Sequence, residues 1–255
     1  MIAILSPAKN IDFTPIDLPQ PLSRPMFVNH ANELVAMLRE FSPTYLAALY
    51  KVSNNLAELN FMRFAQWQAL ADDNALRPAG FAFHGEVYRG FDIRSLSSEQ
   101  LEWGNRHICI LSGLYGLLHL LDGIQAYRLE MGTRLDFGQY TTLYDLWRDT
   151  ITQQIAFAIA GSSGDKVLVN LASIEYAKVV NRQSLGFPVL DIDFKQEHQG
   201  SLRNVTVYAK RARGLMARFM SMHQIEAIED LKSFDLEGYM FSFHHSSEKK
   251  WVFIR

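Results

Sequence analysis

The stretch Tyr208–Phe219, YAKRARGLMARF, is the most informative part of this sequence. It follows Asn204–Tyr208, where apolar and polar residues roughly alternate, as they do in a β-strand. Residues 210–222 then show helical periodicity, with apolar side chains on one arc and basic and small ones on the other. The pattern predicts a strand that leads directly into an amphipathic helix. The apolar arc holds Ala212, Leu215, Met216, Phe219, Met220 and Met222, and the other holds Lys210, Arg211, Arg213, Gly214, Ala217, Arg218 and Ser221.

The charge around this helix is concentrated. No Asp or Glu occurs from His198 to Ile225, and the local charge there is +5 in a chain whose net charge is −2. Solvated helix faces usually mix both signs, because like charges repel each other. Two interpretations stay open, a solvated face and an anion-binding surface whose small residues admit a partner to the backbone. This helix alone does not distinguish a DNA backbone from a small phosphate.

Composition sets the protein class. With 255 residues, 48% hydrophobic and 20% charged, residues 1–255 are expected to form one soluble domain. No apolar run approaches the length of a membrane span, and no signal peptide is indicated. The single cysteine, Cys109, lies in an apolar run, which predicts an inert buried thiol in a reducing cytoplasm. We assume a monomer.

Three mostly apolar segments are typical of buried strands: Met1–Leu5, Arg106–Leu111 and Lys166–Leu171. The first ends in a loop that carries Ser6 and Lys9, and the third runs into a segment where Ser173 caps a helix. Loops after buried strands often form sites in sheet proteins, although a surface turn with a solvated lysine is the alternative.

The remaining pattern predicts a mixed α/β fold, a mixed sheet surrounded by helices. In the extended segment Tyr127–Arg134, Arg128 and Glu130 fall on one face, as a structural ion pair or as a pair that lines a cleft. Other expectations are helices over Asn29–Phe41, Ser42–Val52, Asn55–Trp67 and Leu143–Ala160, a strand and turn over Phe81–Gly90, a helical turn over Leu117–Gly123, strands over Val189–Phe194 and Arg203–Tyr208 joined through Gln199–Gly200, and a closing hairpin of Tyr239–Phe243 with Trp251–Ile254.

The sequence lacks the motifs of several enzyme classes. There is no G-x-G-x-x-G, no G-x-x-x-x-G-K-[ST] and no G-x-S-x-G. Tyr176 and Lys178 are two residues apart, whereas a short-chain dehydrogenase needs four. His244–His245 lacks partners at metal-ligand spacing. No cofactor or metal is therefore expected.

A set of long motifs, in order along nearly the whole chain, resembles the YaaA peroxide stress family. They are ILSPAK (Ile4–Lys9), FHGEVYRGF (Phe83–Phe91), LSGLYGLL (Leu111–Leu118), YRLEMGTRL (Tyr127–Leu135), VNLASIEY (Val169–Tyr176), YAKRARGLMARF (Tyr208–Phe219) and EGYMF (Glu237–Phe241).

The resemblance implies a bacterial cytoplasmic protein that limits iron-driven damage during hydrogen peroxide stress. It implies a single α/β domain with a basic cleft, a helix-hairpin-helix-like element and binding to double-stranded DNA without sequence specificity. Matched by motif, the cleft cations are Lys9, Arg128, Arg134, Lys210, Arg211, Arg213 and Arg218. The sequence departs from the family at His119-Leu120, where Arg-Pro is common, and at Ala126, where Pro is usual.

Two hypotheses follow. In the first, the protein binds DNA through these cations. We favour this one; in the alternative, it is an enzyme for a small anionic or nucleotide-like substrate, in which Lys9 and Arg128 bind the anion and Glu130 is the candidate acid or base. Both use one cleft, lined also by Ser6, Ser173 and Glu175.

Overall fold

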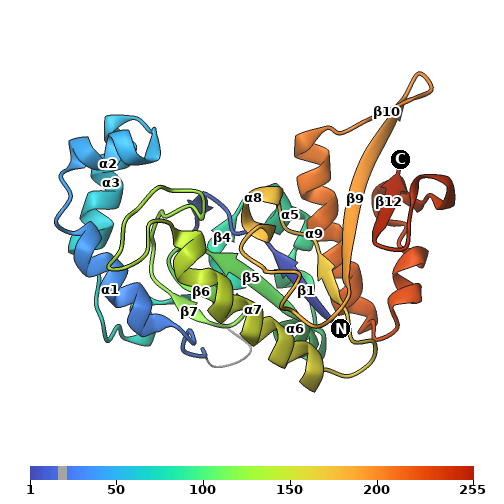
Figure 1. Ribbon diagram of the computed structural model, residues 1–255, viewed down its shortest axis with the longest axis horizontal. Coiled ribbons are helices and arrows are strands. Elements are labelled where there is room, and N and C mark those ends of the chain that lie inside the picture. The colour runs from blue at the N-terminus through green and yellow to red at the C-terminus, as the bar shows by residue number, and fades with distance from the viewer. Residues whose placement is uncertain (17–21) are drawn as a thin grey trace.

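The computed structural model describes residues 1–16 and 22–255. Its main element is an eight-stranded mixed sheet of order β11-β12-β9-β8-β1-β5-β6, with β10 paired to β9 (Figure 1). The strands are β1 (Ile2–Leu5), β5 (Ile108–Ser112), β6 (Gly116–His119), β8 (Leu168–Asn170), β9 (Val189–His198), β10 (Ser201–Arg203), β11 (Met240–Phe241) and β12 (Lys250–Ile254). Two small sheets pair β2 (Asn10–Ile11) with β4 (Phe83–His84) and β3 (Arg77–Pro78) with β7 (Gly123–Ile124).

The centre of the sheet is parallel, which confirms the mixed α/β prediction. Strand β1 pairs in parallel with β5 and with β8, so that Ile4 lies opposite both Cys109 and Asn170. Strands β9 and β12 continue in parallel beyond β8, while β6, β10 and β11 are antiparallel. The chain thus places β5 on one side of β1 and β8 on the other. At such a reversal the loops after the two adjacent strands diverge, which opens a crevice at their carboxyl ends.

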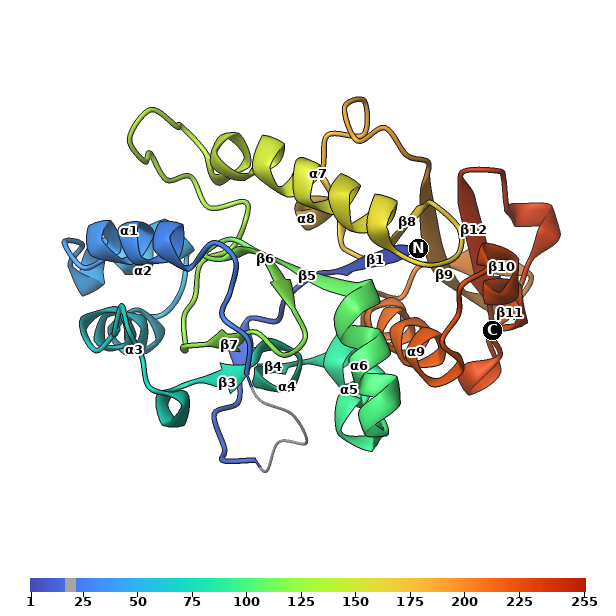
Figure 2. The ribbon, with the colours of Figure 1, turned by 90° about the horizontal axis from the view of Figure 1, so that it is seen from below.

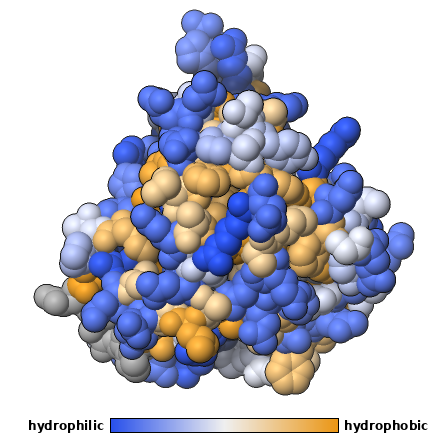
Figure 3. All heavy atoms as spheres, turned by 90° about the vertical axis from the view of Figure 1, so that its left-hand side faces the viewer, coloured by the Kyte–Doolittle hydropathy of each residue, from blue (hydrophilic) through white to orange (hydrophobic). Residues whose placement is uncertain are grey.

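Helices cover both faces of the sheet. Helix α7 lies on one face and α5, α6 and α9 on the other, while α1, α2 and α3 form one end of the molecule (Figures 1 and 2). Figure 3 shows this end from outside, with hydrophilic and hydrophobic residues mixed on its surface. The helices are α1 (Val28–Leu38), α2 (Pro43–Tyr50), α3 (Asn54–Ala65), α4 (Ala79–Ala82), α5 (Glu86–Phe91), α6 (Ser98–His107), α7 (Leu143–Gly161), α8 (Ile174–Ala177) and α9 (Thr206–His223). The predicted helices over 29–41, 42–52, 55–67 and 143–160 are confirmed, with Ser42 capping α2. The closing hairpin is also confirmed, as β11 and β12.

The predicted strand over Asn204–Tyr208 is wrong. Helix α9 begins at Thr206, and the strand that pairs with β9 is the shorter β10. Val207 and Tyr208 are 47% and 44% exposed, so their apolar character does not mark a buried strand. A five-residue alternation is too short to separate a strand from the first turn of a helix.

The sequence left open that the small residues of α9 admit an outside partner to the backbone. They pack against α5 and α6 of the same chain. A Cβ on Gly214 would lie 1.7 Å from the Val87 carbonyl oxygen, and one on Gly90 would lie 2.2 Å from that of Arg211. Ser221 is buried and packs against Gly104 of α6. These contacts fix the position of α9, and therefore of its cations, relative to the sheet.

Two shorter expectations are corrected as well. The segment over 81–90 is mostly helical, with α4 and α5 flanking the two-residue β4. Helix α5 lacks an amphipathic pattern of its own and is stabilised by its packing on α9. The segment over 117–123 contains β6, which pairs with β5 through Leu111 and Leu117. Because both faces of β6 are covered, its sequence lacks the alternation that marks a half-exposed strand.

Candidate functional site

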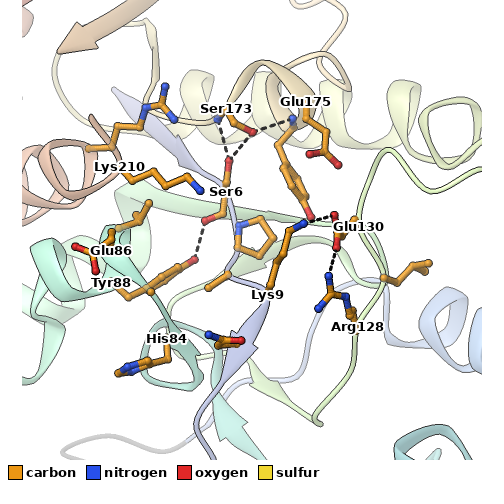
Figure 4. Close-up of a pocket in the computed structure, with 18 of the residues that line it drawn as sticks. Ser6, Lys9, His84, Glu86, Tyr88, Arg128, Glu130, Ser173, Glu175 and Lys210 are labelled. Carbon is orange, nitrogen blue, oxygen red and sulfur yellow. Dashed lines mark hydrogen bonds and ion pairs between the residues drawn. The ribbon is translucent and has the colours of Figure 1, made fainter. Parts of the chain in front are cut away.

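A cavity of about 460 Å³ opens at the carboxyl ends of β1 and β8 (Figure 4). We call it the strand-end pocket. Its wall is built from the loop after β1, from α8 and the residue before it, from an extended segment after β7, from β4 and α5, and from the first half of α9. The side chains used below are Ser6, Lys9, Glu86, Tyr88, Tyr127, Arg128, Glu130, Ser173, Glu175, Tyr176, Lys210 and Arg213, all of which line it.

Ser6 and Ser173 join the two loops that diverge at the sheet. The Ser173 backbone N–H donates to Ser6 Oγ at 2.8 Å, and Ser6 Oγ donates to Ser173 Oγ at 3.2 Å. The Ser173 hydroxyl also caps α8 by accepting from Tyr176 N. Tyr88 Oη donates to the Ser6 carbonyl at 3.0 Å. Both hydroxyls are thus occupied in holding the pocket together, which is a positioning role.

Glu130 is held between two cations. Lys9 Nζ lies 2.9 Å from its Oε2, and Arg128 Nη2 lies 2.7 Å from its Oε1. The Arg128 side chain is only 12% exposed, and its buried Nε has no hydrogen-bond partner in the described residues. The predicted Arg128–Glu130 pair therefore forms, and it lines a pocket, so both interpretations of the pair hold together (Figure 4).

Lys210 and Arg213 lie one turn apart on α9, and both line the pocket. Neither forms an ion pair within the part of the chain that the structure describes. Lys210 is exposed and points into the pocket towards Ser6 (Figure 4). Arg213 is half-buried, and burial lowers the pKa of its guanidinium from the usual value, an effect that Asp193 partly opposes.

Close backbone contacts fix the position of the segment that carries Arg128 and Glu130. A Cβ on Gly113, just after β5, would lie 2.4 Å from the Leu129 carbonyl oxygen, so glycine lets the segment with Arg128 and Glu130 cross the strand end. Gly132 N donates to Glu175 Oε1 at 3.0 Å, which ties α8 to the same segment.

Three buried tyrosines contribute to the lining. Burial raises the pKa of Tyr88, Tyr127 and Tyr176 above the ordinary value of 10.0, so all three are protonated at neutral pH. Tyr127 Oη is hydrogen-bonded to Ser112 Oγ at 2.7 Å. Sequence reasoning did not select these tyrosines, because nothing in their spacing separates a pocket wall from the core.

The remaining predicted cations lie elsewhere. Arg211 Nε is 2.6 Å from Glu237 Oε1, and Arg218 Nη1 is 2.7 Å from Asp92 Oδ2. Neither residue lines the pocket, and nor does the exposed Arg134. The structure thus brings together four of the seven predicted cations, Lys9, Arg128, Lys210 and Arg213, and one face of α9 does not present all of its basic residues to one site.

The positions where the sequence departs from the family also lie outside the pocket lining. His119 Nδ1 is hydrogen-bonded to the Asn105 carbonyl at 3.0 Å, and its backbone N–H donates to the buried Asp122. Leu120 is fully buried, and Ala126 is half-buried. The two residues at 119 and 120 therefore serve the turn after β6.

Burial and geometry bear on three other features: the cysteine, a metal site and a membrane-spanning helix. Cys109 is buried in β5, and burial raises the pKa of its thiol to about 12. Within residues 1–16 and 22–255, no three or more His, Cys, Asp or Glu side chains are grouped so that they would hold a metal ion. No helix in those ranges has the length and apolarity that a bilayer crossing needs.

Comparisons with known proteins agree with the motif resemblance. The family model described as peroxide stress protein YaaA matches residues 1–245. A UPF0246 protein of Idiomarina loihiensis is 44% identical over 256 residues, covering 100% of this chain and 98% of its own length. A UPF0246 protein of a Janthinobacterium species is 43% identical, and one of a Shewanella species 42%, each over 255 residues, all of this chain and 98% and 99% of their own lengths. This chain therefore belongs to the YaaA family of peroxide stress proteins.

Proposed function

We propose that this peroxide stress protein binds a small anionic ligand in the strand-end pocket. The observation that carries the proposal is the pair Lys210 and Arg213, which line a cavity at a strand-order reversal without forming an ion pair in the described chain. Ligands of open α/β sheets bind in crevices at such reversals. A cavity of about 460 Å³ also lies within the usual range for small-molecule sites.

The half-buried Arg213 supports an anion in particular. Desolvation of a cation is costly, and the carboxylate that acts on Arg213, Asp193, forms its ion pair with Lys250, so a bound phosphate or carboxylate would supply a direct counter-charge and hydrogen-bond acceptors. Lys9 and Arg128 differ, because Glu130 already lies between them. In an enzyme of this design, Lys210 and Arg213 would hold the anion first, and Glu130 would act as acid or base only after leaving its two cations.

A thermal-shift series tests the proposal. Inorganic phosphate, pyrophosphate and ribose 5-phosphate are added to the wild type and to Lys210→Ala/Arg213→Ala at low ionic strength. At one hundred times the dissociation constant, a bound ligand stabilises by about 2.7 kcal/mol, which raises the melting temperature of a chain of this size by about 5–10 °C.

The double variant should lose this shift. Arg106→Ala, which removes a cation of α6 that pairs with Glu102 outside the pocket, should keep it. Absence of any shift in the wild type, or an equal shift in the double variant, would refute the proposal.

A second candidate is sequence-independent binding of duplex DNA, by which the protein would limit iron-driven damage. The acid-free segment supports it, because Arg203 and Lys210 are exposed and neither pairs with a carboxylate in the described residues. A further support is the three-residue connection between α2 and α3, where the exposed Lys51 has a left-handed backbone (φ 53°). This helix pair is our candidate for the helix-hairpin-helix-like element.

A salt titration on a short duplex tests this candidate. Each phosphate contact contributes about 0.9 to the slope of log affinity against log salt, so Arg203→Ala/Lys210→Ala should reduce the slope by about two. Arg211→Ala/Arg218→Ala removes cations that already pair with carboxylates and should change it less. The same protein should protect a plasmid from nicking by ferrous iron and peroxide. A flat salt response would exclude this candidate.

A further inference from the structure

The strand-end pocket has two chemically different ends. Lys210 of α9 lies on one side, whereas the carboxylates of Glu130 and Glu175 lie on the opposite side (Figure 4). Arg213 lines the pocket one turn further along α9. The second end carries no net charge, because Lys9 and Arg128 offset Glu130 and Glu175, so a second anionic group would gain little there, whereas a hydrogen-bond donor would meet a carboxylate oxygen. The complementary ligand therefore carries an anionic group at one end and N–H donors at the other.

Of the two carboxylates at the second end, Glu175 has the free acceptor capacity. Its Oε1 accepts one hydrogen bond, from Gly132 N, and its Oε2 has no partner in the described part of the chain. Glu130, in contrast, is occupied by Lys9 and Arg128. An ionised carboxylate is an acceptor only, with about four lone-pair sites, so Glu175 is able to receive two parallel N–H donors.

Apolar and aromatic residues also line the pocket. They are Pro7, Ala8, Val87, Tyr88 and Tyr127. Such a surface fits a flat ring system with little charge. The pocket thus offers cations at one end, a carboxylate at the other, and apolar and aromatic residues in its lining.

From this arrangement we infer that the pocket binds a guanine nucleoside monophosphate, an inference that rests on the anion site of the proposed function. The phosphate contacts Lys210 and Arg213, and the base directs its ring N–H and its amino group at Glu175. Guanine presents these two donors side by side. Adenine and cytosine present one amino group beside a ring nitrogen that accepts, and its lone pair would face the carboxylate at a cost in affinity.

Equilibrium binding of GMP, AMP and ribose 5-phosphate to the wild type and to Glu175→Gln tests the inference. The wild type should bind GMP about ten- to a hundredfold more tightly than AMP or ribose 5-phosphate, as expected for hydrogen bonds to a charged group. The Gln side chain keeps an oxygen for Gly132 N, so the fold around α8 is preserved. It should lose the preference for GMP while its affinity for ribose 5-phosphate stays within about twofold.

A matched control is Glu86→Gln. This carboxylate lines the same pocket but pairs with Arg89, and its removal should leave the GMP preference intact. Equal binding of GMP, AMP and ribose 5-phosphate by the wild type would overturn the guanine inference while leaving the anion site standing. A Glu175→Gln variant that keeps the preference would overturn it too. If no phosphate compound binds at all, the proposed function itself fails.

Discussion

The crossing of α5 and α9 provides a sharp test of how the site is positioned. At Gly214 a Cβ would lie 1.7 Å from the Val87 carbonyl oxygen, whereas Cβ atoms essentially never come closer than 3.0 Å to such an atom. The replacement Gly214→Ala therefore forces the two backbones apart by at least about 1.3 Å, the difference between these two distances. The clash is with backbone, so no side-chain rotation relieves it.

The size of the effect follows from opposing terms. Overpacking in a well-packed region costs about 1–3 kcal/mol and sometimes more, while alanine gains about 1 kcal/mol over glycine in a helix. Because a backbone carbonyl cannot move aside alone, we expect the cost to lie at about 3 kcal/mol, which leaves a net loss of about 2 kcal/mol. For a chain of this length the melting temperature should fall by about 4–8 °C.

Urea and thermal unfolding of Gly214→Ala beside Gly161→Ala measure this. Gly161 ends α7 and has open space around its Cβ position, so its replacement should leave the free energy of unfolding unchanged or raise it by up to about 1 kcal/mol. A Gly214→Ala protein as stable as the wild type would refute the packing argument. If it folds, it should also bind phosphate more weakly, because α9 carries both unpaired cations.

Three further outcomes follow from buried and paired groups. Cys109 should resist a thiol reagent at pH 8 in the folded protein and react only on unfolding, since burial raises its pKa to about 12; rapid labelling of the native state would contradict this. Burial lowers the pKa of His107 below the ordinary 6.5, so the unfolded chain binds the proton first and the free energy of unfolding should fall as the pH drops below about 6.5, a fall that His107→Gln should reduce. If the free energy of unfolding falls just as much in that variant, the role given to His107 is wrong. Glu130→Gln leaves Lys9 and Arg128 without a counter-charge and should tighten phosphate binding about tenfold, measured by calorimetry; weaker binding would show that Glu130 does not compete with the anion.

The strand ends that carry the site could be predicted from sequence because their signals are local. Met1–Leu5 and Lys166–Leu171 are short apolar runs that stop at Ser, Pro or a helix cap, and β1 and β8 confirm them. Ser173 caps α8 for the same local reason, a hydroxyl placed before the first free N–H groups. The order of the strands in the sheet is set by tertiary contacts and cannot be predicted from local sequence. The pocket depends on that order.

The Arg128–Glu130 pair could be predicted because its members are two residues apart, whereas ion pairs between distant segments could not. Lys9 and Glu130 meet only because the loop after β1 and the segment after β7 converge on the same crevice. Likewise, the acid-free run around α9 suggested one basic surface, but Glu237 and Asp92 arrive from other segments and neutralise Arg211 and Arg218. The net charge counted along this part of the sequence therefore overstated the number of unpaired cations on the folded protein.

The small residues of α9 illustrate the same limit. Gly214 and Ser221 alternate with basic residues, a pattern equally compatible with an outside ligand and with close helix packing. Helices α5 and α6 occupy that face, and only the tertiary contacts distinguish the two cases. The strand-end pocket is what this packing leaves open at the start of the helix.

The most direct test of the anion site is to locate a bound oxyanion. Crystals soaked in tungstate, a heavy analogue of phosphate, would give an anomalous signal at the anion position. The account predicts a peak within hydrogen-bond distance of Lys210 Nζ and the Arg213 guanidinium, and its loss in Arg213→Ala crystals. A wild-type pocket without a peak, or a peak that persists unchanged in Arg213→Ala, would contradict it.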